Sequence, residues 1–196
     1  MTFKKITNQY KGILENEGLR RYFNFSAFIF FVFFVLGMIF AKMNFAEAKE
    51  LFLEISKKYE FAIDYNFWQL FVFIFNNNVM IAFSAFLSGI IFGIPTMIIL
   101  ITNSFVIGTV VMIATEDMDI FSIIFSLLPH GIFEIPAILL ALSLGFLLGR
   151  LMYGYLFKKK RIDEKFSFLV KVFFYVVFPL LFIAAFVEAA LISFFK

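Results

Sequence analysis

The stretch that decides the fold is YNFWQLFVFIFNNNVMIAFSAFLSGIIFGIPTMIILITNSFVIGTVVMIAT, residues 65–115, which contains no charged side chain. A helix crosses the hydrocarbon core of a bilayer with roughly 20 apolar residues. The stretch has 51 residues, too many for one membrane span and enough for two. It is interrupted by three residues typical of a turn, Gly89, Gly93 and Pro95. The sequence therefore predicts transmembrane helices over residues 66–89 and 95–115.

The rest of the chain has the same apolar character. Of its 196 residues, 63% are hydrophobic, and the mean hydropathy is +0.97. This composition is too apolar for a soluble domain and indicates an integral membrane protein. Three further runs have the length of a membrane span, residues 22–41, 131–157 and 168–194. We therefore expect an all-α, polytopic transmembrane helix bundle of about five spans, forming a single membrane domain over residues 1–196.

The distribution of charge predicts how the bundle sits in the cell membrane. Basic residues are concentrated in residues 1–21 and in the loop of residues 158–167. Because cytoplasmic loops carry an excess of Lys and Arg, we expect both segments in the cytoplasm. Residues 42–65 carry balanced to acidic charge and are expected outside. Five spans then place the N-terminus in the cytoplasm and the C-terminus outside.

Three segments outside the spans are predicted to lie along the membrane surface or to enter it only in part. Residues 1–21 contain an amphipathic pattern, which is typical of a cytoplasmic interfacial helix. Residues 42–65 contain an apolar stripe at helical spacing, formed by Ala48, Leu51, Phe52, Ile55 and Tyr59. Residues 120–128 precede the fourth span, and we expect a re-entrant or interfacial segment there.

Seven polar residues within the spans form a candidate intramembrane polar cluster. In hydrocarbon each polar group needs a partner, so such residues are where function can be concentrated. His130 and Glu134 are four residues apart and share a helical face, which makes His130 the simplest partner for Glu134. The cluster acts either as a structural clamp or as part of a proton or cation pathway. Its members are Asn76, Asn77, Asn78, Asn103, His130, Glu134 and Glu188.

Small residues recur every four positions along the fourth span and across the end of the second span. Such rows let helix backbones approach closely, either within one chain or across a homodimer. The predicted packing residues are Ala85, Gly89, Gly93, Ala137, Ala141, Gly145 and Gly149.

The residue inventory argues against an enzyme. The chain has no cysteine and a single histidine, which excludes thiolate chemistry and any site built from two imidazoles of one chain. It contains no Gly-x-Ser-x-Gly elbow, no HExxH and no phosphate-binding loop. We therefore predict no catalytic residues, no metal site and no cofactor. No basic motif indicates nucleic acid as a partner, and an intramembrane hydrolase is less favoured than a scaffold or a transport protein.

Three blocks resemble the stage II sporulation protein M family. They are FNNNV at residues 75–79, NSFVIG at 103–108 and PHGIFEIPA at 129–137, with the glycines and proline of the turn between the first two. The resemblance implies a polytopic scaffold. The protein that gives the family its name works in endospore formers with a peptidoglycan hydrolase and another membrane protein during engulfment of the forespore. The family motif falls here on Asn78, Asn103, His130, Gly131, Glu134 and Pro136. No family residue is established as catalytic.

The resemblance favours a non-enzymatic scaffold or assembly subunit of a membrane complex. Its expected partners are the lipid bilayer and either a second copy of the chain or other membrane proteins. The alternative is a small channel, transporter or transporter accessory subunit, in which Asn78, Asn103, His130 and Glu134 form the polar site. The sequence does not identify a small-molecule or ion ligand.

Overall fold

The structure is a computed structural model that describes residues 16–57, 60–119, 121, 123 and 130–195. Every regular element in these ranges is a helix, which confirms the predicted all-α class. Five helical stretches are long and apolar enough to span a membrane, Glu17–Met43, Phe67–Ile90, Ile94–Glu116, Gly131–Lys158 and Asp163–Phe194. The predicted interfacial segment before residue 16 lies outside the described residues. The same holds for the predicted re-entrant segment, apart from residues 121 and 123.

The helices follow one another along the chain with short connections. Several membrane-spanning stretches combine an α-helix with a shorter 3-10 or π segment. In chain order the elements are α2 (Glu17–Met43), α3 (Phe45–Lys57), η1 (Glu60–Asp64), α4 (Phe67–Leu87), η2 (Ser88–Ile90), α5 (Ile94–Asp117), η3 (His130–Glu134), α7 (Ile135–Lys158), α8 (Asp163–Val172), η4 (Phe173–Val177) and α9 (Phe178–Phe195).

Local capping explains where several helices begin. The Asn16 side chain accepts the backbone N–H of Leu19 at 2.9 Å, so α2 begins at Glu17, before the predicted start at residue 22. A reciprocal capping box between Asn66 and Gln69 starts α4. Helix α5 follows Gly93, whose φ of 77° is a left-handed conformation that glycine adopts without strain.

The two π-helices, η3 and η4, each end two residues before a proline. Glu134 precedes Pro136 in this way, and Val177 precedes Pro179. Proline has no backbone N–H and cannot complete the hydrogen bond to the carbonyl four residues earlier. A local π-turn is a common adjustment at such an interruption and frequently occurs at functional sites. The sequence predicts that the fourth span begins at residue 131, and the spanning stretch of the structure is Gly131–Lys158, with the change from η3 to α7 between Glu134 and Ile135.

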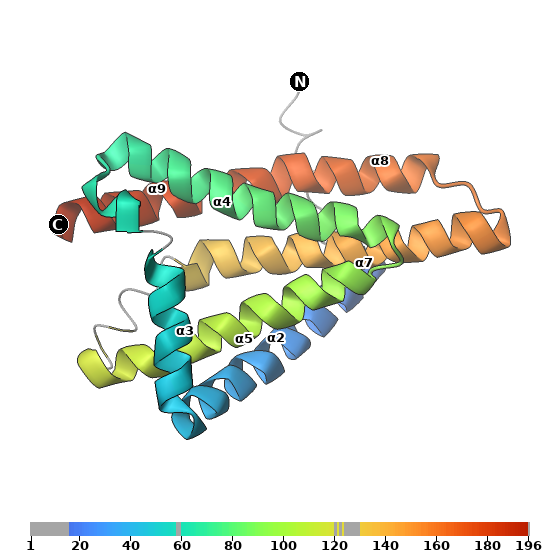
Figure 1. The fold of residues 1–196 in the computed structure, drawn as a ribbon. Coiled ribbons are helices and arrows are strands. Elements are labelled where there is room, and N and C mark those ends of the chain that lie inside the picture. Colours follow the sequence, from blue (N-terminus) through green and yellow to red (C-terminus); the bar gives the residue numbers. More distant parts are fainter. Residues whose placement is uncertain (1–15, 58–59, 120, 122, 124–129, 196) are drawn as a thin grey trace.

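The spanning helices form two groups that meet at α7 (Figure 1). Helices α2 and α5 lie side by side, while α4 and the α8–α9 stretch pack against the other side of α7. Over the 18 most apolar consecutive residues of the Gly131–Lys158 stretch, which contains α7, 50% of the residues are buried. The corresponding share for α2 is 11%. Helix α7 is therefore the core of the bundle, and α2 presents most of its surface outward.

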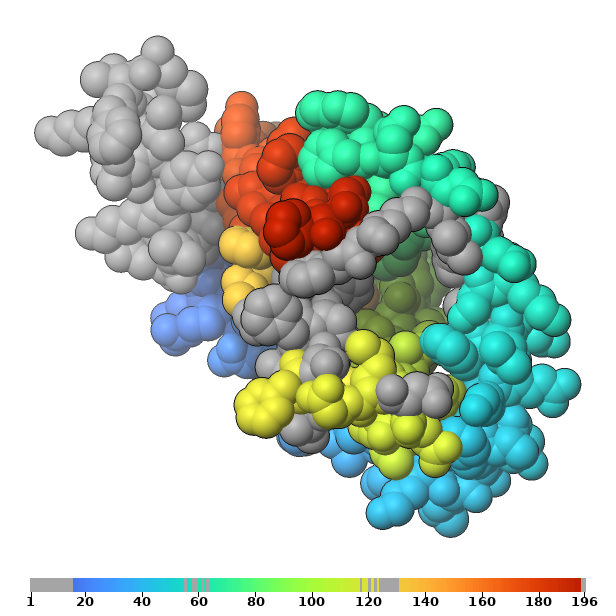
Figure 2. Space-filling view, turned by 90° about the vertical axis from the view of Figure 1, so that its left-hand side faces the viewer, coloured from blue at the N-terminus to red at the C-terminus, as the bar shows by residue number. Residues whose placement is uncertain are grey.

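The amphipathic helix α3 crosses one end of the bundle. Ala48 of α3 is buried against Ala41 of α2 and Ile113 of α5, with Phe52 packed beside them. Figure 2 views this end, where α3 lies beside the ends of α2 and α5. Ala48 and Phe52 belong to the predicted apolar stripe, whereas Leu51 is exposed. The side chain of Ile55 and all of Tyr59 lie outside the described residues.

Candidate functional site

A buried hydrogen bond joins two of the predicted polar residues across the bundle. The side-chain amide Nδ2 of Asn78 on α4 donates to Oε2 of Glu134 at the end of η3, at 2.7 Å. Only 4% of Asn78 and 7% of Glu134 are exposed. A hydrogen bond to a carboxyl oxygen in surroundings of low dielectric is strong, and it satisfies groups that hydrocarbon cannot solvate. This contact fixes α4 relative to the start of α7.

Of the three consecutive asparagines, only Asn78 faces the interior. Asn76 and Asn77 are exposed, and Asn77 donates to Oδ1 of Asn78 at 3.3 Å. Successive helical residues point about 100° apart, so the triplet cannot face one neighbour. Asn77 thus orients the side chain of Asn78, whose own amide nitrogen reaches Glu134.

Asn103 lies close to the same place but makes a different hydrogen bond. Its Nδ2 donates to the backbone carbonyl of Ile99 on its own helix, α5, at 2.8 Å. Asn103 and Glu134 both line a cavity of about 40 Å³, otherwise surrounded mainly by apolar side chains that include Phe30 and Leu142. A cavity of this size with polar groups on its wall can hold ordered water. The structure thus brings Asn78, Asn103 and Glu134 to one region from three different elements.

The two remaining members of the predicted cluster are His130, on η3, and Glu188, on α9. His130 begins η3, but its side chain lies outside the described part of the structure, so its pairing with Glu134 stays a prediction. Glu188 is half-buried on α9, one residue before Ala189. Ala189 packs with Leu70 in the first turn of α4, nearer the end of the bundle than Asn78.

The predicted small residues lie at contacts inside the chain. A Cβ added at Gly89 would collide with the carbonyl oxygen of Gly145, and one added at Gly149 would collide with the backbone of Phe92 and Gly93. Ala85, Ala137 and Ala141 are fully buried. The glycines bring α7 into backbone contact with the α4–α5 connection, as expected of small residues in membrane bundles.

Two further glycines perform the same role between α2 and α5 and were missed by the sequence analysis. A Cβ at Gly37 would collide with the carbonyl oxygen of Phe105, and one at Gly108 with that of Phe34. The Thr109 hydroxyl also donates to the Gly37 carbonyl at 3.3 Å. The signal was an isolated glycine inside each span, because a glycine within a helix weakens it unless close packing compensates.

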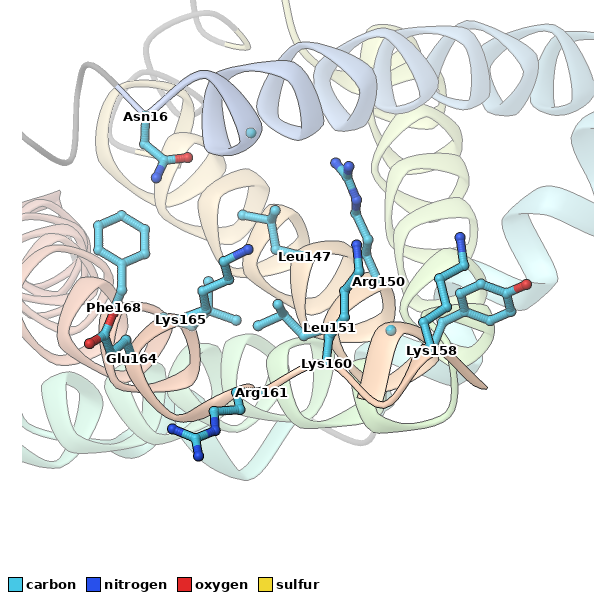
Figure 3. Close-up of a pocket in the computed structure, with 14 residues that line it drawn as sticks. Asn16, Leu147, Arg150, Leu151, Lys158, Lys160, Arg161, Glu164, Lys165 and Phe168 are labelled. Carbon is cyan, nitrogen blue, oxygen red and sulfur yellow. The ribbon is translucent and has the colours of Figure 1, made fainter. Parts of the chain in front are cut away.

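A second polar region lies where α2 and α8 begin and α7 ends, which we call the basic end. A pocket of about 500 Å³ opens there, lined by Arg150, Lys158, Lys160, Arg161 and Lys165 together with Glu164 (Figure 3). The basic loop of residues 158–167 was predicted from the sequence, whereas no role was predicted for Arg150. The available signal was that Arg150 is a charged residue inside the predicted span of residues 131–157. In the part of the chain that the structure describes, no group of three His, Cys, Asp or Glu residues has metal-site geometry.

Five apolar spanning helices with an internal polar contact define a polytopic α-helical membrane protein. The chain belongs to the stage II sporulation protein M family, because residues 26–191 match the sequence model of Stage II sporulation protein M. The family resemblance drawn from the three sequence blocks is thereby confirmed. The chain is also similar to the uncharacterized protein MJ0793 of Methanocaldococcus jannaschii, with 31% identity over 130 residues that cover 65% of this chain and 70% of that protein. No solved structure matches the chain.

Proposed function

We propose that this chain is a non-enzymatic scaffold or assembly subunit of a membrane complex. The observation that supports the proposal is the buried hydrogen bond from Asn78 to Glu134, which ties α4 to the start of α7. Interhelical hydrogen bonds of this kind in membranes stabilise the fold by about 0.6–2 kcal/mol. The most buried polar groups of the family motif then serve helix packing, and the outward faces remain available for partners.

The faces available for association include those of α2 and α3. Phe28 and Phe31 on α2 are 65% and 64% exposed, and Leu53 on α3 is 49% exposed. In a bilayer such apolar faces contact lipid, a second copy of the chain or another membrane protein. The family name refers to sporulation, and the matching Methanocaldococcus jannaschii protein is described only as uncharacterized, so neither supplies an activity for this chain.

The proposal is tested with Glu134→Gln in reconstituted vesicles. A glutamine at this position keeps an oxygen that accepts the Asn78 amide, so the helix contact should persist while the ionisable group is lost. We expect the variant to assemble as the wild type does, and neither protein to move protons, Na⁺ or K⁺ faster than empty vesicles. An ion flux that is present in the wild type and lost in Glu134→Gln would overturn the scaffold proposal.

The second candidate is a transport function, favoured by the cavity between Asn103 and Glu134. Polar groups beside a cavity at an interrupted helix are a recurring feature of transport sites. The absence of native cysteine allows a direct test with single cysteines at Ser104 and Ala137, both fully buried. The scaffold proposal expects both to resist a membrane-impermeant thiol reagent, whereas the exposed control Ser167→Cys reacts. Rapid labelling at both buried positions would favour an aqueous pathway.

A further inference from the structure

The pocket at the basic end combines positive charge with an apolar wall. Five basic side chains and one acidic side chain line it, so a single carboxylate offsets only part of the charge. Leu147, Leu151 and Phe168 form part of the same lining. A ligand complementary to this pocket therefore carries negative charge on one side and apolar surface on the other.

The connection between α7 and α8 places part of this charge. Lys159 adopts a left-handed conformation with φ of 50°, and the N–H of Lys160 donates to the carbonyl oxygen of Gly154 at 3.1 Å. The chain thereby turns back along α7, and a Cβ at Gly154 would lie 3.7 Å from Cδ of Lys160. The Lys160 side chain is thus laid against α7, near the charged residues of that helix.

Arg150 enters the pocket from within α7. It lies eight residues before Lys158, the last residue of α7, which corresponds to about 12 Å along a helix axis. In Figure 3 the charged ends of Arg150, Lys158 and Lys160 point the same way, whereas Arg161 points the opposite way. An arginine guanidinium is planar and binds phosphate oxygens through two parallel hydrogen bonds. Arg150 is therefore the side chain best suited to contact a phosphate at the depth of the membrane interface.

An apolar groove of about 610 Å³ adjoins the basic pocket. It shares Arg150 and Tyr153 with the pocket, and its other lining residues include Phe25, Met97 and Ile98 on the spanning helices α2 and α5. The basic pocket and the apolar groove thus meet at Arg150. This arrangement matches a phospholipid, whose phosphate and acyl chain are covalently joined.

We propose that the basic pocket and the adjoining groove together bind one anionic phospholipid. The phosphate-containing headgroup lies among Arg150, Lys160 and Lys165, and one acyl chain follows the groove past Ile98. A free phosphate shares the chemistry of the headgroup but leaves the groove unused. Phosphatidylglycerol is therefore the expected ligand class, and inorganic phosphate is the comparison ligand that separates the two sources.

The test measures thermal unfolding of the full chain in an uncharged detergent, because a ligand that binds only the folded state raises the unfolding temperature. Short-chain phosphatidylglycerol, short-chain phosphatidylcholine and inorganic phosphate are titrated separately. We expect stabilisation by phosphatidylglycerol and much weaker effects of the other two. If phosphatidylcholine stabilises the chain as much as phosphatidylglycerol does, the charged pocket does not contribute to binding. If inorganic phosphate stabilises it as much, the groove does not contribute, and either result would overturn the proposal.

Matched double variants locate the binding site. Arg150→Gln/Lys160→Gln removes two charges from the pocket, and Arg20→Gln/Arg21→Gln removes two exposed charges from α2 at the same end. We expect at least about a tenfold loss of phosphatidylglycerol affinity in the pocket variant, as for removal of charge-assisted hydrogen bonds. The α2 variant should bind nearly as the wild type does. Equal losses in both variants would overturn a defined site in favour of general surface attraction.

A third variant tests the groove separately from the charges. Ile98 is 57% exposed, so Ile98→Trp should fill the groove without disturbing the core. We expect weaker binding of phosphatidylglycerol with unchanged binding of its soluble headgroup, glycerol phosphate. If Arg150→Gln/Lys160→Gln does not fold, Lys165→Gln replaces it as the pocket variant. Unaltered phosphatidylglycerol binding in Ile98→Trp and in the pocket variant would overturn the proposal.

Discussion

The polar contact inside the bundle and the pocket at the basic end use polar residues in opposite ways. Inside, one amide and one carboxyl meet at 2.7 Å, and both are more than nine-tenths buried. At the basic end, five cations and one carboxylate surround a pocket of about 500 Å³. The inner groups bind each other, whereas the like charges around the pocket favour binding of an anion that the chain itself does not supply.

This difference separates stability from ligand binding. Removing one partner of a buried hydrogen bond leaves the other partner desolvated, so the cost appears in the free energy of unfolding. Removing one exposed charge leaves the remaining groups in water, so folding changes little and binding of an anion changes more. Substitutions in the two regions should therefore alter different measured quantities.

The largest loss of stability is expected at a backbone contact rather than at either polar region. Gly89→Ala places a Cβ against the carbonyl oxygen of Gly145, and no flexible side chain can move aside to relieve the clash. Overpacking of this kind costs about 1–3 kcal/mol or more. We expect a lower free energy of unfolding, or loss of folded protein, in detergent denaturation.

Gly131→Ala is the matched control for this prediction. Among the residues that the structure describes, none has an atom within 4 Å of a Cβ added at Gly131. The alanine variant should therefore unfold close to the wild-type midpoint. A larger loss at Gly131 than at Gly89 would contradict the packing described here and indicate a separate requirement for glycine in η3.

The inner polar contact should follow in size. Asn78→Ala removes the donor to Glu134 and leaves a buried carboxyl oxygen without that partner. The expected loss in the free energy of unfolding is about 1–3 kcal/mol. Asn76→Ala, at an exposed position in the same helix, should change it by less than about 0.5 kcal/mol. Equal effects at both positions would indicate that the amides act through the helix rather than through Glu134.

Much of this inner region was predictable from sequence because the bilayer imposes strict rules. A charge-free stretch must be divided into spans of membrane length, and buried polar residues in any span must find partners. Glu134 and the asparagine triplet were identified on that basis. The particular partnership was not predicted, since helical periodicity pairs Glu134 with His130 on its own helix, whereas the donor Asn78 comes from α4. Pairing between helices depends on their relative depth, which hydropathy does not specify.

The basic end was less predictable for a different physical reason. Its charges were assigned to the cytoplasmic side by the positive-inside rule. That rule concerns the number of basic residues near a span and not their arrangement in space. The pocket depends on the left-handed turn at Lys159 and on Arg150 lying within reach of the loop lysines. Neither property follows from composition. The glycine contacts between α2 and α5 were missed similarly, because Gly37 and Gly108 are isolated in sequence and meet the partner backbone only after packing.

A smaller effect with the opposite sign is expected at Ser26. Its Oγ is buried and has no hydrogen-bond partner within the described residues. Burying an unpaired hydroxyl is unfavourable, so Ser26→Ala should raise the free energy of unfolding by about 1 kcal/mol. Ser104→Ala is the matched control, because the buried Ser104 Oγ donates to the Leu100 carbonyl at 2.7 Å. A loss at Ser26 similar to that at Ser104 would indicate that Ser26 has a partner in the membrane.

The smallest change in folding stability is expected at the basic end, in contrast to the inner contact between Asn78 and Glu134. Arg150 is exposed, and surface charges contribute little to stability when the remaining groups stay solvated. Arg150→Gln should change the free energy of unfolding in lipid-free detergent by less than about 0.5 kcal/mol. Arg161→Gln, whose side chain points away from the other charges in Figure 3, should behave alike in detergent. The unfolding temperatures of the two variants should differ only when phosphatidylglycerol is added, because in the proposed site Arg150 contacts the headgroup. A large loss for Arg150→Gln without lipid would make Arg150 a structural residue and remove the contrast with Asn78.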